Sequence, residues 1–149
     1  MARTIEKRDA LLRAARGRYV AFVDDDDAIY PDYARRIVEA AQASTPDVIT
    51  FLQECFINGV RGVAEFGLGN PNEPFIPNAV GVFKRNAWHI CAWRRSLAIQ
   101  SHFPATNYGE DWAFAARLCA TPGLVSSHIP EILHVYRHSI HTTEAPPGA

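Results

Sequence analysis

The sequence predicts an α/β fold, a mixed sheet flanked by helices, on the basis of three observations. Segments with helical spacing of apolar residues alternate with short β-rich apolar runs along the chain. The run at 18–23 is almost wholly apolar, which is typical of a strand buried in a parallel or mixed sheet. An Asn-Gly pair at 58–59 separates two strand-like runs, so part of the sheet is predicted to be a hairpin.

Four segments are predicted to be helical: 4–16, 31–43, 94–103 and 110–120. Gly17 ends the first, and Pro31 suits the first turn of the second because its missing N–H costs nothing there. The last segment is predicted to be well buried. One of its faces carries Trp112, Ala115, Ala116 and Cys119, and Phe114 and Leu118 lie beside it.

The predicted strands are 18–23, 48–57, 60–66, one or two short strands within 79–93, 124–129 and 131–138. The segment 67–78 is rich in Gly, Pro and Asn and is predicted to be a loop, as is 104–109. We expect one domain over 1–141, followed by a polar, disordered tail at 142–149.

Composition excludes several classes of protein. The chain has 149 residues, with 15 Lys plus Arg against 16 Asp plus Glu, so it lacks the basic charge of a general nucleic-acid binder. No apolar stretch approaches the roughly 20 residues of a membrane span, and the N-terminus lacks the apolar run of a signal peptide. Three scattered cysteines, Cys55, Cys91 and Cys119, fit a reducing compartment, so a cytoplasmic location is expected.

Four consecutive aspartates, 24–27, follow the first strand at the place where open α/β sheets bind ligands. Alternate side chains of a strand face the same way, so Asp24 and Asp26 are predicted to share one site. Like charges this close raise one another's pKa values unless a cation compensates, and Mg²⁺ or Mn²⁺ suits such oxygen ligands. The alternative is a solvated acidic turn before a helix.

Glu110 and Asp111 form a second acidic pair at the start of a predicted helix. Taken alone, two acids in a first helical turn are more simply explained by the helix dipole than by chemistry.

Three stretches, 7–33, 91–118 and 132–143, together resemble the GT-A fold glycosyltransferases of the family-2 type. The first resembles the family's helix, Ala-x-Gly-x-Tyr, strand and DxD motif. The second resembles its acceptor-side segment ending in Glu-Asp, and the third its closing strand with Tyr-Arg followed by His. The resemblance implies a metal-dependent, inverting hexosyltransferase that moves a sugar from a nucleotide-sugar, commonly a UDP-sugar, to an acceptor hydroxyl.

The resemblance also implies roles for the acids. Asp24 would contact the nucleotide ribose or the metal, and Asp26 would ligate Mn²⁺ or Mg²⁺ with support from Asp27. The metal would stabilise the departing diphosphate. Asp111, assisted by Glu110, would be the general base that takes the acceptor's proton.

Further residues are assigned by the same resemblance or by their chemistry. A further metal ligand is expected at His138 or His141, although a surface or capping histidine is the better explanation for each alone. Donor binding is expected of Arg8, Asp25 and Arg94. Tyr108, Trp112 and Trp93 are the candidates for acceptor stacking. Apolar neighbours favour the core for most of the tryptophans, so Tyr108, in a loop beside the acid pair, is the best placed.

One departure from the family is large. Members usually begin with a strand-helix-strand unit that holds the nucleotide base, and here only the helix before the DxD strand is present. An exposed sheet edge is therefore expected, with homo-oligomerisation or a completing chain as its consequence.

Two other functions compete with the transferase. A non-catalytic nucleotide- or carbohydrate-binding remnant would keep the DxD without turnover. A HAD-like phosphohydrolase also has DxD after a strand. It needs Thr or Val where this chain has Ala28, and it also needs a lysine later in the sequence. The sequence does not identify the sugar, the nucleotide or the acceptor.

Overall fold

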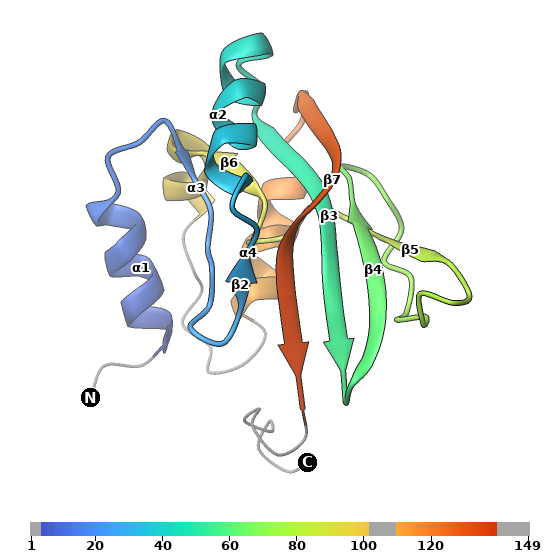
Figure 1. Ribbon diagram of the computed structural model, residues 1–149. Helices are drawn as coiled ribbons and strands as arrows, with labels where there is room; N and C mark the ends of the chain where they lie inside the picture. Colours follow the sequence, from blue (N-terminus) through green and yellow to red (C-terminus); the bar gives the residue numbers. More distant parts are fainter. Residues whose placement is uncertain (1–3, 102–109, 140–149) are drawn as a thin grey trace.

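The computed structural model describes residues 4–101 and 110–139. Within them, seven strands form one mixed sheet and four helices pack around it (Figure 1). The helices are α1 (Thr4–Ala14), α2 (Tyr33–Ser44), α3 (Arg95–Ser101) and α4 (Glu110–Cys119). The strands are β1 (Tyr19–Val20), β2 (Ala28–Ile29), β3 (Val48–Ile57), β4 (Val60–Phe66), β5 (Val82–Arg85), β6 (Ala92–Arg94) and β7 (Ser126–His138). The predicted fold class, a mixed sheet flanked by helices, is confirmed.

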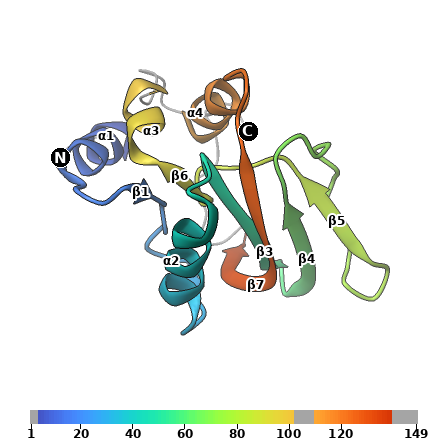
Figure 2. The same ribbon diagram turned by 90° about the horizontal axis from the view of Figure 1, so that it is seen from above.

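The strand β3 is the centre of the sheet. It pairs antiparallel with β4 and β6 and parallel with β7, and the path of paired strands runs β1-β6-β3-β4-β5. In Figure 2, α1, α3 and α4 lie on one side of the strands and α2 on the other. Side chains between these layers form the core, the largest fully buried ones being Trp93, Phe51, Phe114, Leu12, Ile49, Leu118 and Leu133.

The hairpin β3–β4 forms where the Asn-Gly pair predicts it. Asn58 and Gly59 both have positive φ, 49° and 83°, which is the requirement of a tight turn matched to the twist of two strands. Ile57 and Val60 pair directly across that turn.

The first strand is shorter and less buried than predicted. Only Tyr19 and Val20 pair, with β6, and residues 19–22 are half-buried because β1 is the last strand on its side of the sheet path. After β1 the chain stays close to the β5–β6 segment, since the Phe22 N–H donates to the His89 carbonyl at 3.3 Å.

Two features near the site differ from the prediction. The short strand β2 was not predicted, and it pairs with β7, Ala28 opposite Val135, which brings the aspartates beside β7. The two predicted late strands are one strand, β7, whose register against β3 shifts near Pro130, a residue without an N–H for the ladder.

The prediction that α4 is well buried holds for Phe114, Ala115 and Leu118, which are buried, and is wrong for Trp112, which is 60% exposed. Ala116 and Cys119 are half-buried, so the inward side of the helix centres on Phe114, Ala115 and Leu118.

Candidate active site

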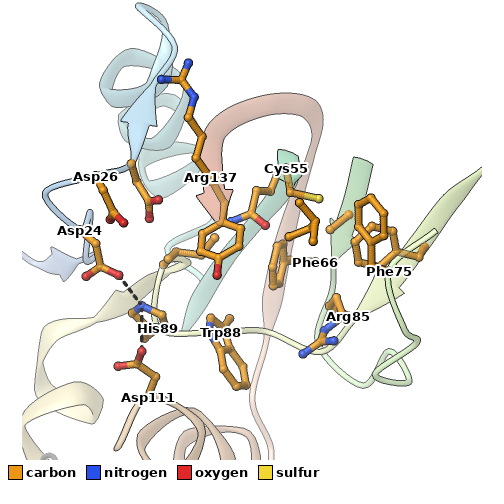
Figure 3. Close-up of a pocket in the computed structure, with 17 residues that line it drawn as sticks. Asp24, Asp26, Cys55, Phe66, Phe75, Arg85, Trp88, His89, Asp111 and Arg137 are labelled. Atoms are coloured by element: carbon orange, nitrogen blue, oxygen red, sulfur yellow. Dashed lines mark ion pairs between the residues drawn. The ribbon is translucent and has the colours of Figure 1, made fainter. Parts of the chain in front are cut away.

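A cavity of about 460 Å³ lies between the residues after β1, the start of α4 and the strands β3, β4, β5 and β7. Its polar end carries Asp24, Asp26, Asp27, Asp111, His89 and Arg137. Its other end carries Phe66, Phe75, Phe83 and Cys55. Figure 3 shows the acids at one end and Phe66 and Phe75 at the other, with His89 and Trp88 between them.

Arg8 and His89 join the two acidic motifs. Arg8, on α1, donates to Asp24 Oδ1 at 2.8 Å and also pairs with Asp111, so one buried guanidinium holds both carboxylates. His89 Nε2 lies 3.9 Å from Asp24 and 3.8 Å from Asp111 (Figure 3). The nearby His89 imidazole, and after it the charge of Arg8, lowers the pKa of Asp24 to about 2 against the opposing effect of burial.

Asp27 has the opposite character. Its side chain is only 2% exposed, and burial, reinforced by repulsion from Asp24 and Asp26, raises its pKa to about 7. Its Oδ2 lies 3.6 Å from Nε2 of His134, whose own pKa burial lowers to about 4. Among the described residues, Asp27 Oδ1 and His134 Nε2 are buried without a hydrogen-bond partner.

The acidic end therefore fits a divalent cation. It concentrates carboxylates that repel one another and contains an unsatisfied buried carboxylate oxygen. Within 4–101 and 110–139, however, no three His, Cys, Asp or Glu side chains converge closely enough to hold a metal ion by themselves. This arrangement matches cations that are bound by one or two carboxylates and complete their shell with substrate phosphates and water.

The structure contradicts two of the predicted site residues. Trp93 is 1% exposed and its indole N–H donates to the Trp88 carbonyl, so it is a core residue and offers no face to an acceptor. Arg94 ends β6 and pairs with Tyr19, the first residue of β1, whereas the aspartates follow β1 further along the chain. Its guanidinium is held by Asp47 and by the carbonyls of Thr45 and Pro46.

Four further predicted residues do not line the main cavity, and one of them is Arg8, which pairs with Asp24 and Asp111. Asp25 is exposed and does not line it, so donor contact by Asp25 is not supported. Trp112 lines a separate cavity of about 360 Å³, which it shares with Trp88. His138 stacks on Tyr136, with ring centroids 6.4 Å apart, and its metal role stays a prediction. Tyr108, His141 and the side chain of Glu110 lie outside the described residues.

Sequence reasoning missed His89 and gave no role to His134, Gln53 or Arg137. His89 lies in an apolar stretch, and no motif spacing connects it with the aspartates. Gln53 Nε2 and His134 Nδ1 lie 3.0 Å apart on neighbouring strands, a contact that depends on the β3–β7 register. The local sign was the alternation Leu133-His134-Val135, because in a strand the side chain of His134 points to the opposite face from its two apolar neighbours.

The model of the family "Glycosyl transferase family 2" matches residues 4–96, more than half of the chain. The chain belongs to this family. The match includes α1, the four aspartates and His89 and supports the GT-A resemblance of the sequence. It decides against the phosphohydrolase alternative.

Solved structures of S. aureus TarS share the fold. One TarS structure matches with a TM-score of 0.65 and 18% identity over 90% of this chain and 24% of that one. TarS 1-349 in complex with UDP matches with a TM-score of 0.66 and 21% identity over 92% of this chain and 40% of that one. TarS 1-349 in complex with UDP-GlcNAc matches with a TM-score of 0.62 and 15% identity, over 97% and 43%.

The chain thus spans less than half the length of these structures. No curated protein matches it. Of the helices in the described part of the chain, none is long and apolar enough to cross a membrane.

Proposed function

We propose that this domain is the catalytic part of a glycosyltransferase that moves a sugar from a nucleotide-sugar donor to an acceptor hydroxyl. The observation that supports it best is the meeting of Asp24 and Asp111 at Arg8 and His89. Two acidic motifs far apart in the sequence lie at one end of one cavity. Glycosyl transfer needs both a group for the donor diphosphate and a base for the acceptor, and the two motifs supply one each.

The proposed step is a single displacement. The acceptor oxygen bonds to the anomeric carbon while the bond from that carbon to the diphosphate oxygen breaks and its electron pair leaves with the nucleoside diphosphate. Asp111 takes the acceptor's proton. One direct displacement inverts the configuration at the anomeric carbon, so inversion is part of the proposal.

Asp24 and Asp26 are proposed as the residues that hold Mn²⁺ or Mg²⁺, with Asp27 supporting. The bound cation would supply Lewis-acid neutralisation of the diphosphate charge. Arg8 and His89 act as positioning residues in this proposal, because they hold Asp24 and Asp111 at a fixed separation.

UDP-sugars are the first donors to test, because the structures similar to this chain include TarS bound to UDP and to UDP-GlcNAc. The test is calorimetric titration of UDP with and without Mn²⁺, with GDP and dTDP as comparisons. We expect metal-dependent binding that Asp26→Ala abolishes. Asp25→Ala is the matched control, since Asp25 is adjacent but exposed and outside the cavity.

The same samples separate turnover from binding. Release of free UDP from UDP-GlcNAc and formation of a glycoside are measured with a panel of hydroxyl acceptors, in the wild type and in Asp111→Asn. Nucleotide binding without turnover for any donor and acceptor would support the binding-remnant alternative. A folded sample that binds no nucleotide would overturn the proposal.

A further inference from the structure

The half of the cavity away from the aspartates has a built aromatic wall, which we define as Phe66, Phe75, Phe83 and Trp88. Phe66 and Phe83 come from the neighbouring strands β4 and β5 and are each 5% exposed. Phe75 comes from the connection between these strands and packs edge-on against Phe83, with ring centroids 5.6 Å apart. Trp88 comes from the connection between β5 and β6. Two strands and two connections thus converge on one apolar surface.

Gly62 on β4 seats Phe75 in this wall. A Cβ added at Gly62 would lie 2.4 Å from the Phe75 ring and 2.9 Å from the Ile76 carbonyl oxygen. Any larger residue at 62 would therefore push the ring away. The close approach fixes Phe75 against the strand, so the wall is a formed part of the fold.

Apart from Tyr136, which lies opposite Cys55 in the β3–β7 ladder, two polar side chains of the described residues border this half of the cavity, and both already have partners in the protein. Arg85 donates to the Glu73 carbonyl at 3.2 Å and its guanidinium lies 5.9 Å from the centre of the Trp88 ring. Gln53 is paired with His134. A sugar ring placed here would bury several hydroxyls against Phe and Cys side chains, and each unpaired hydroxyl is costly. An apolar group would instead gain by covering the aromatic surface.

We infer that the aromatic wall binds an apolar part of the acceptor, next to the hydroxyl that reacts near Asp111. The acceptor is then an amphipathic alcohol, such as a glycoside with an alkyl or aromatic substituent. The inference rests on the proposed transferase function, and it adds the chemical class of the acceptor. The cavity's 460 Å³ lies within the range of small-molecule sites.

The test compares methyl, octyl and phenyl β-glucoside as binding probes, each below any micelle concentration, by calorimetry in the presence of UDP and Mn²⁺. The three share the sugar and differ only in the apolar group. We expect octyl or phenyl glucoside, or both, to bind about tenfold or more tightly than methyl glucoside, the factor that 1.4 kcal/mol gives. Comparing the affinities of octyl and phenyl glucoside shows whether the wall prefers an alkyl chain or an aromatic ring.

Three variants place the effect at the wall. Phe75→Ala is expected to remove most of the preference over methyl glucoside, and Phe75→Leu to keep much of it. Val80→Ala is the control, because Val80 is in the same connection but 74% exposed and outside the cavity. Gly62→Ala is expected to reduce the preference by displacing the Phe75 ring, whereas Gly59→Ala, where an added Cβ meets no atom within 4 Å, is expected to leave the preference unchanged.

UDP binding distinguishes a failure of the transferase proposal from a failure of the acceptor inference. Absence of UDP binding in the wild type would count against the transferase proposal itself. Normal UDP binding with equal affinity for all three glucosides would overturn the acceptor inference and leave the transferase proposal in place. A preference that Phe75→Ala leaves unchanged, with UDP binding intact, would overturn it as well.

Discussion

Replacing Arg8 with alanine tests whether one guanidinium holds the two acidic motifs together. In the structure Arg8 pairs with Asp24 and Asp111, and its side chain is 11% exposed. Its removal would leave two partly buried carboxylates facing each other. We therefore expect Arg8→Ala both to destabilise the fold and to disturb the donor site.

The magnitude follows from the burial of the three groups. Removing one partner of a fully buried ion pair costs about 3–5 kcal/mol, and an exposed pair is worth about 0–1 kcal/mol. The Asp24 and Asp111 side chains are 35% and 28% exposed, so water screens part of the charge. An intermediate loss of about 2 kcal/mol in the free energy of unfolding is expected. For a urea slope near 2 kcal/mol/M, that lowers the midpoint by about 1 M.

Urea unfolding followed by tryptophan fluorescence measures this loss, and Arg13→Ala is the matched control. Arg13 lies on the same helix and pairs with Asp9, but its side chain is 75% exposed, so its loss should cost less than about 0.5 kcal/mol. Arg8→Lys should fall between the two, because an ammonium lacks the fork that serves two carboxylates. Equal midpoints for Arg8→Ala and Arg13→Ala would refute the reasoning.

Three other predictions concern the base, the tryptophans and the thiols. Asp111→Asn should lower sugar transfer by about 10²–10⁴-fold with little change in UDP affinity, measured by UDP release and calorimetry. Trp93→Ala should cost about 3–5 kcal/mol of stability because the ring is in the core, whereas Trp112→Ala, at a 60% exposed ring, should cost under about 1 kcal/mol in the same urea assay. Burial raises the pKa of Cys91 to about 12 and those of Cys55 and Cys119 to about 11, so at pH 8 these thiols stay protonated. Iodoacetamide should therefore alkylate the folded protein about a hundredfold more slowly than the urea-unfolded chain; equal rates would contradict it.

Local signals predicted much of the fold. The strands 48–57 and 60–66 and the Asn-Gly turn between them lie where the sequence places them, because alternation, β-branched residues and a two-residue turn act over neighbouring positions. The helices α1, α2 and α4 begin and end within a few residues of prediction for the same reason. The strand β2 was missed because its two residues pair only with β7, more than a hundred positions away.

The candidate site divides in the same way. The sequence shows the four aspartates and the Glu-Asp pair, and their order with the Tyr-Arg-His segment was enough to identify the family. It did not show that His89 lies between Asp24 and Asp111, or that Arg94, at the end of β6, pairs with Tyr19 and not with the aspartates. It suggested Trp93 and Trp112 alike as acceptor contacts, although one is in the core and the other is exposed.

The sequence by itself therefore determined the fold class, the central hairpin and the acidic motifs, since each depends on residue types at short spacing. Only the tertiary structure decided which residues face those acids and what lines the rest of the cavity. Arg8, His89 and the aromatic wall come from separate elements, and their meeting depends on long-range strand register and helix packing. Those are set by burial of the whole core, which no local pattern encodes.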